Sequence, residues 1–191
     1  MALVSDVTTR VNYLFKEAGI DENDRRWRDA EFFLWVNDGQ SEIMRMNPEA
    51  TSTRREFTCA AGAVQELDAT DYLLLRAHGM TLFVRDLLDL YDPGWEDAAA
   101  GTPAEYAYDS QRDTRRFYVN PPAAANAKIN LTVSQRCTAV TALGDSLTVK
   151  DEYLPALALY VAHRGMSKQA EYGSAGLDAS FLAQFRVAMG G

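Results

Sequence analysis

The chain has few of the residues on which most enzyme and metal sites depend. Its 191 residues include two histidines, His78 and His163, which fall in different predicted elements and show no metal-ligand spacing with the cysteines. The phosphate loop G-x-x-x-x-G-K-[ST], the dinucleotide motif G-x-G-x-x-G and the hydrolase motif G-x-S-x-G do not occur. We therefore expect neither a cofactor, nor a metal site, nor catalytic activity.

Cysteine is equally scarce, with only Cys59 and Cys137, both in segments that we predict as strands. A cross-strand disulfide is one reading of this pair. Two isolated cysteines in a chain whose residues 1–10 lack the basic and apolar pattern of a signal peptide are more typical of free, buried thiols. We therefore expect free thiols.

Long apolar runs and a basic excess are also missing. No apolar stretch reaches the roughly 20 residues that a membrane helix requires, so we expect no contact with a membrane. The net charge is −8 and the isoelectric point about 4.8. This charge argues against tight, non-specific DNA binding, which requires many lysines and arginines. It remains compatible with a surface that DNA passes without adhering.

The apolar residues that are present recur at helical spacing near both ends of the chain. They predict helices over residues 5–18, 29–46, from Asp151 to a break at 173–176, and 177–189. The segment Asn37-Asp38-Gly39 also reads as a turn, but the apolar phase continues across it, so we keep one helix. A glycine on the packed face of that helix would let another backbone approach closely.

Between Glu56 and Arg136 the apolar period changes to two, which predicts strands. The clearest prediction is a hairpin of residues 116–120 and 128–134, joined by a loop that begins at Pro121-Pro122. A short helix is expected just before Pro93. The fold class is therefore α+β: a helical bundle of residues 1–50 and 145–191, with an antiparallel sheet or small sandwich of residues 51–144 inserted between its halves.

Charged and aromatic side chains gather in the second half of this insertion. Its carboxylates could hold a cation, although a solvated face fits their irregular spacing better; they are Glu96, Asp97, Glu105, Asp109 and Asp113. Its basic cluster could bind a carboxylate of a neighbouring subunit, touch nucleic acid, or balance charge at a strand end; it consists of Arg112, Arg115 and Arg116. Its aromatic residues fit either a core or a protein interface.

Three ordered blocks of the sequence resemble one family, the head-to-tail adaptor (connector) proteins of tailed bacteriophages, including the members similar to tail tubular protein A. The first block runs from Trp27-Arg28-Asp29-Ala30-Glu31 through Trp35-Val36-Asn37-Asp38-Gly39-Gln40 to Pro48-Glu49-Ala50. The second contains Pro93-Gly94-Trp95, Gly101-Thr102-Pro103-Ala104-Glu105-Tyr106 and Arg116-Phe117-Tyr118-Val119-Asn120-Pro121-Pro122. The third runs from Leu143-Gly144-Asp145 through Asp151-Glu152-Tyr153 to Ser167-Lys168-Gln169-Ala170-Glu171.

The resemblance implies a structural protein of the virion, assembled in the host cytoplasm. Such adaptors form a ring with copies of themselves, usually a dodecamer, between the portal protein and the tail nozzle or tail tube. The ring extends the channel through which phage DNA passes without sequence recognition. The alternative is a non-viral, soluble protein-interaction module without catalytic activity.

The resemblance also suggests which residues make these contacts. Because only Gly190 and Gly191 follow the last predicted helix, we expect that helix itself to face the portal. Its predicted contact residues are Leu177, Phe181, Leu182, Phe185 and Met189. The residues predicted to face the tail or a neighbouring subunit are Trp95, Tyr106, Tyr108, Arg112, Arg115, Arg116, Pro121 and Pro122.

Overall fold

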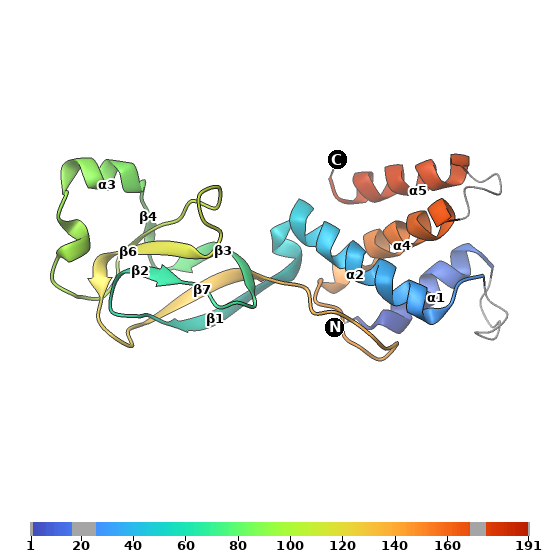
Figure 1. Cartoon of the computed structure of the whole chain (residues 1–191), viewed down its shortest axis with the longest axis horizontal. Helices are drawn as coiled ribbons and strands as arrows, with labels where there is room; N and C mark the ends of the chain where they lie inside the picture. Colours follow the sequence, from blue (N-terminus) through green and yellow to red (C-terminus); the bar gives the residue numbers. More distant parts are fainter. Residues whose placement is uncertain (1, 17–25, 169–174, 191) are drawn as a thin grey trace. The chain divides into compact units, whose positions relative to one another are not determined.

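The structure is a computed structural model that describes residues 2–16, 26–168 and 175–190. The chain divides into two compact units. The first combines Met1–Thr51 with Cys137–Gly191 and is helical; the second is Ser52–Arg136 and consists mainly of strands (Figure 1). The predicted α+β fold class is confirmed. Residues 137–144 lie in the helical unit.

In the described part of the first unit there are four α-helices: α1 (Val4–Leu14), α2 (Asp29–Met46), α4 (Leu154–Lys168) and α5 (Ala175–Ala188). Two short 3-10 turns join them to their surroundings, η2 (Pro48–Thr51) and η4 (Asp151–Tyr153). The bounds predicted for α2 are confirmed. The helix predicted over 5–18 ends earlier, at Leu14, and residues 17 and 18 lie outside the described part. The predicted break at 173–176 is wrong at Gly176, which belongs to α5, while residues 173 and 174 are outside the described residues.

Aromatic rings and close glycine contacts form the core of the helical unit. Trp27 is 2 % exposed and stands nearly perpendicular to Trp35, with 5.8 Å between their ring centroids. Gly39 of α2 lies directly against α4: a Cβ at this position would be 2.6 Å from Cδ1 of Leu157. The expectation that Gly39 permits a close approach is therefore correct.

The second unit contains two sheets. One has the strand order β1-β7-β3, formed by Ser52–Thr58, Lys128–Gln135 and Asp71–His78. The other has the order β2-β6-β5-β4, formed by Gly62–Glu66, Arg116–Ala123, Glu105–Ala107 and Thr81–Leu82. All paired strands are antiparallel except β4 and β5. A single apolar cluster, including Leu131 and Val133 of β7 with Phe117 and Val119 of β6, joins the inner faces of the two sheets.

The predicted hairpin of residues 116–120 and 128–134 is wrong. These segments form β6 and β7, which pair with other strands in different sheets. Pro121 and Pro122 do not end the strand either, because β6 continues to Ala123 and the Pro122 carbonyl accepts the Gly101 N–H at 2.9 Å. The period of two correctly indicated two strands. It could not indicate their partners, since alternation describes only which side chains face the core.

A short helix lies between β4 and β5. It is α3 (Arg85–Tyr91), followed by the 3-10 turn η3 (Trp95–Asp97). The helix predicted just before Pro93 is therefore present.

The cysteines do not occupy strands as predicted. Cys59 follows the end of β1, and Cys137 follows the end of β7. Both are free thiols. Burial raises the pKa of the Cys137 thiol to about 11, so this sulfur is protonated near neutral pH.

Candidate interaction surfaces

Helix α5, predicted to contact the portal, turns most of its apolar residues inward. Phe185 is 2 % exposed and lies with its ring centroid 5.3 Å from that of Tyr160 on α4. Phe181, Leu182 and Met189 are half-buried and pack against the same core. Of the five predicted portal residues, only Leu177 is largely exposed, at 57 %. These apolar residues therefore serve mainly to attach α5 to the bundle.

Polar contacts reinforce this attachment at the start of α5. The Ser167 hydroxyl on α4 donates a hydrogen bond to Oδ1 of Asp178 at 2.6 Å, and His163 Nδ1 lies against the same carboxylate. The described outer surface of α5 nevertheless offers another large apolar side chain, Val187, which is 71 % exposed. A helical projection of the sequence places Val187 away from Phe181 and Phe185, and could have identified it.

The aromatic residues predicted to face a tail or a neighbour are largely buried. Trp95 is 1 % exposed and Tyr106 is 8 % exposed. The Tyr108 hydroxyl donates to the Thr114 carbonyl at 2.9 Å, and burial raises its pKa. Pro122 is buried and Pro121 half-buried. These residues are packed within the strand unit, so they expose little side-chain area that a partner could contact.

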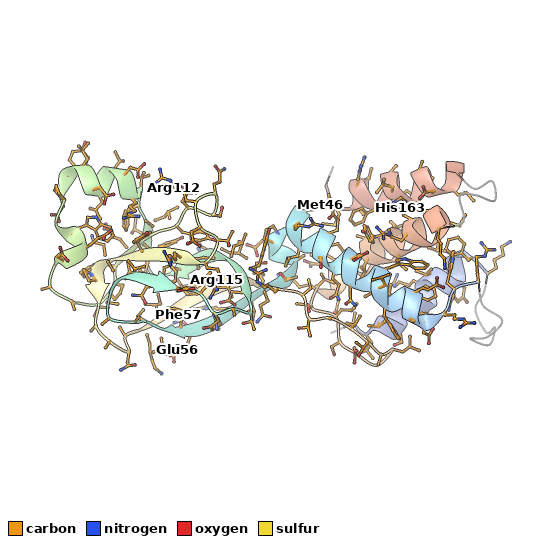
Figure 2. The ribbon with its side chains drawn as sticks, viewed as in Figure 1. Met46, Glu56, Phe57, Arg112, Arg115 and His163 are labelled. Atoms are coloured by element: carbon orange, nitrogen blue, oxygen red, sulfur yellow. The ribbon has the colours of Figure 1, made fainter. Side chains whose placement is uncertain are left out.

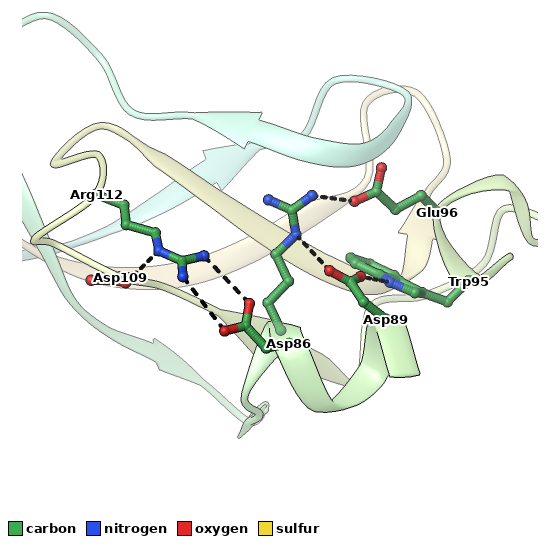
Figure 3. A network of polar contacts seen from close by, with 7 residues as sticks. Asp86, Asp89, Trp95, Glu96, Asp109 and Arg112 are labelled. Carbon is green, nitrogen blue, oxygen red and sulfur yellow. Dashed lines mark hydrogen bonds and ion pairs between the residues drawn. The ribbon is translucent and has the colours of Figure 1, made fainter. Parts of the chain in front are cut away.

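The three predicted arginines are all paired with carboxylates of the same unit. Arg112 spans Asp86, at 3.3 Å, and Asp109, at 3.5 Å (Figure 3). Arg115 lies 3.0 Å from Glu66 and Arg116 lies 3.7 Å from Asp113. Of the alternatives that the sequence left open, this geometry fits charge balance at a strand end.

A second polar network attaches α3 to the sheet (Figure 3). Arg85 bridges Asp89 and Glu96, at 3.7 Å and 2.9 Å, and Nε1 of buried Trp95 donates to Asp89 at 2.8 Å. The guanidinium carbon of Arg85 also lies 4.0 Å from the centroid of the Tyr118 ring. The carboxylates of Asp86, Asp89 and Glu96 thus have protein partners. Among the described residues no group of three or more His, Cys, Asp or Glu is arranged to hold a metal ion.

Although it is anchored by these contacts, α3 has no buried residue. Leu87 is 51 % exposed, Leu90 71 % and Tyr91 80 %. Beside the helix, a groove of about 390 Å³ is lined in part by Leu82, Val84 and Tyr118. These residues were not predicted as contact residues, although the three leucines within Arg85–Tyr91 are a signal for an apolar surface in the sequence.

The outer face of the β1-β7-β3 sheet is a second surface that was not predicted from the sequence. Arg54, Thr132 and Arg76 lie in one row across the three strands, and Glu56, Asn130 and His78 lie in the next. Glu56 marks this face in Figure 2, and Arg112 marks the neighbourhood of α3. Alternation within β1 and β7 could have indicated the face, but the order of the strands could not be known in advance.

Comparison with known proteins assigns the chain to a family. The model of the SU10 adaptor protein family matches residues 3–191, nearly the whole chain and both of its units. This match confirms the resemblance to phage head-to-tail adaptors. No curated protein matches the chain. Within the described residues no helix is long and apolar enough to cross a membrane.

Proposed function

Because the chain belongs to the SU10 adaptor protein family, an adaptor family of bacteriophages, we propose that it forms a ring between the portal and the tail. In this proposal it is a structural virion protein without catalytic activity, assembled in the host cytoplasm. Its partners are further copies of itself, in a dodecamer, the portal protein and a tail nozzle or tail tube protein. Phage DNA passes through the ring without sequence recognition.

The observation that carries this proposal is the extent of the family match. It includes the helical unit and the strand unit together, so the resemblance does not rest on one common motif. The charge of the chain supports the same role. At a net charge of −8, a surface lining the channel would repel phosphate and allow DNA to slide.

Within this proposal, α5 faces the portal through its outward residues. Phe185 and its neighbours hold the helix on α4, whereas Leu177 and Val187 are exposed and available for contact. Changes at the buried residue should therefore affect folding, and changes at the two exposed residues should affect portal binding. Phe185→Ala should cost about 3–5 kcal/mol of unfolding free energy, while aspartate at Leu177 and Val187 should leave the fold intact.

The test mixes the protein with the portal ring encoded beside it, and compares the mass and negative-stain images of the mixture with those of each protein alone. We expect an added ring at one end of the portal, with one copy per portal subunit. Absence of association at micromolar concentration, with the protein shown to be folded, would contradict the proposed function.

The docking assignment needs its own variants. Leu177→Asp with Val187→Asp should abolish association with the portal. The matched control is Leu34→Asp on α2, a leucine of similar exposure at 58 %, which should associate as the unchanged protein does. Normal association of the α5 variant would remove α5 from the portal contact but leave the adaptor function standing.

A further inference from the structure

Two exposed arginines on the outer face of the β1-β7-β3 sheet make no ion pair among the residues that the structure describes. They are Arg54 on β1 and Arg76 on β3, both opposite Thr132 of the central strand. Neighbouring strands lie about 4.8 Å apart, so the backbones of the two arginines are about 10 Å apart on one face. Glu56, a carboxylate on the same face of β1 as Arg54, is 2.6 Å from Lys128 and thus already paired.

His78 lies in the neighbouring row, opposite Asn130, within the electrostatic influence of both arginines. Its Nε2 lies 2.7 Å from the Thr132 hydroxyl. Partial burial and the Arg54 and Arg76 guanidinium groups hold the pKa of His78 below its ordinary value. This local excess of positive charge, in a chain of net charge −8, calls for a partner that supplies carboxylates.

The α3 surface has complementary properties. Residues 84–113 contain eight carboxylates and two arginines. In the described part of the chain, exposed Asp92 and Asp97 form no ion pair; Asp92 directly follows exposed Leu90 and Tyr91, and Asp97 ends the next turn, η3. An apolar patch with an acidic rim is typical of a protein interface.

The two surfaces lie on opposite sides of the same unit. In β6, Phe117 and Val119 point into the core between the sheets, so Tyr118 between them points outward. Arg85 of α3 and Trp95 of η3 both pack against the Tyr118 ring. Helix α3 therefore lies on the outer side of the β2-β6-β5-β4 sheet (Figure 1). Arg54 and Arg76 stand on the outer face of the β1-β7-β3 sheet.

We propose that neighbouring copies in the ring meet through these two surfaces, with Arg54 and Arg76 of one copy against Asp92, Asp97 and Tyr91 of the next. A closed ring requires this kind of head-to-tail contact between two different surfaces of one subunit. The alkyl stems of arginine can cover Leu90 while a guanidinium stacks on the Tyr91 ring. This inference rests on the proposed ring function.

A second copy explains the observations better than nucleic acid does. DNA would neutralise Arg54 and Arg76, but it would leave Leu87, Leu90 and Tyr91 of α3 uncovered. The neighbouring copy covers the apolar residues and neutralises the arginines in one contact.

Charge reversal tests the contact in the assembly on portal rings. The variant Arg54→Glu with Arg76→Glu, and separately Asp92→Lys with Asp97→Lys, should each raise the protein concentration needed for a complete ring by about tenfold or more. The fourfold variant that combines all these changes should recover ring formation, because glutamate then meets lysine at every contact. The control Arg10→Glu with Arg45→Glu makes the same change of charge at exposed positions of α1 and α2 in the helical unit, away from α5, and should assemble normally.

Each outcome decides between the proposals, with circular dichroism confirming that every variant is folded. Normal ring formation by both paired variants, or failure of the fourfold variant to recover, would overturn this inference while the ring function stands. A variant at Arg54 and Arg76 that forms rings but no longer retards a duplex DNA fragment would assign the face to DNA and overturn it too. Failure of the unchanged protein to form a ring would overturn both proposals.

Discussion

The side-chain amide of Asn37 holds the backbone of Val140 with two hydrogen bonds. The Val140 N–H donates to Oδ1 at 2.8 Å, and Nδ2 donates to the Val140 carbonyl at 3.0 Å. One turn further along α2, Oε1 of buried Gln40 accepts the Thr148 N–H at 2.7 Å. The turn-like segment Asn37-Asp38-Gly39 thus lies in the part of α2 that secures the segment before α4.

Asn37→Ala should lower the free energy of unfolding by about 1–3 kcal/mol, because both backbone groups of buried Val140 lose their partner. Urea unfolding followed by circular dichroism measures this. Ser41→Ala is the control, since it removes only a hydroxyl that donates to the Asn37 carbonyl within the same helix, and it should be nearly neutral. Equal losses of unfolding free energy in the two variants would contradict this role of the Asn37 side chain.

Gly39→Ala should destabilise the helical unit although alanine favours helices. The added methyl would lie 2.6 Å from Cδ1 of buried Leu157 and 2.9 Å from Cδ1 of Tyr160. Such overpacking costs about 1–3 kcal/mol, which exceeds the gain of about 1 kcal/mol in helix propensity. Gly176→Ala in α5 is the matched control, because a Cβ there meets no atom within 4 Å, and it should not lower the melting temperature.

Arg55→Met should be costly in the strand unit. Asp71 is fully buried, and its carboxylate is paired with Arg55 and accepts the Asp68 N–H at 3.2 Å. Removing the arginine leaves a buried charge without its cation, which costs about 3–5 kcal/mol. The double variant Arg55→Met with Asp71→Leu should recover much of this loss in urea unfolding; a double variant as unstable as the single one would refute the account.

The same carboxyl predicts a pH dependence. Burial raises the pKa of Asp71 above its ordinary value of 3.8 despite Arg55. A raised folded-state pKa means that the native state binds the proton more tightly, so stability is lost as the pH rises through that pKa. Without Arg55 the pKa should rise further, and the deficit of Arg55→Met in melting temperature should shrink between pH 7 and pH 5. If the melting temperature of Arg55→Met stayed equally far below that of the unchanged protein from pH 7 to pH 5, the raised pKa of Asp71 would not explain the loss of stability.

Asp145 should behave in the opposite way. Hydrogen bonds from the backbone N–H groups of Thr141 and Ala142, at 2.7 Å and 2.9 Å, lower the pKa of Asp145 below 3.8. A depressed pKa contributes stability that is present above pH 3.8 and is lost as the pH falls through the folded-state value. The melting temperatures of the unchanged protein and of Asp145→Asn should therefore converge in acid, as a series of thermal melts from pH 7 to pH 2.5 would show.

Helix α2 was predicted correctly from the sequence, whereas the end of strand β6 was not. The apolar phase of α2 continued through Gly39, and that continuity correctly outweighed the turn-like Asn37-Asp38-Gly39. For β6 the two prolines suggested a loop, because proline lacks the N–H of a central ladder. In the structure the Pro122 carbonyl still accepts a hydrogen bond from Gly101, a contact between distant residues that no local rule could reveal.

By itself, the sequence determined the fold class, the extent of α2 and the family, because periodicity and ordered motifs are properties of the chain alone. Only the tertiary structure decided that β6 and β7 enter different sheets, that Phe185 faces inward, and that Arg54 and Arg76 share a row. These outcomes depend on which distant elements meet. A helix or strand pattern identifies an apolar face. Whether that face is buried in the protein's own core or against a partner depends on packing across the whole unit.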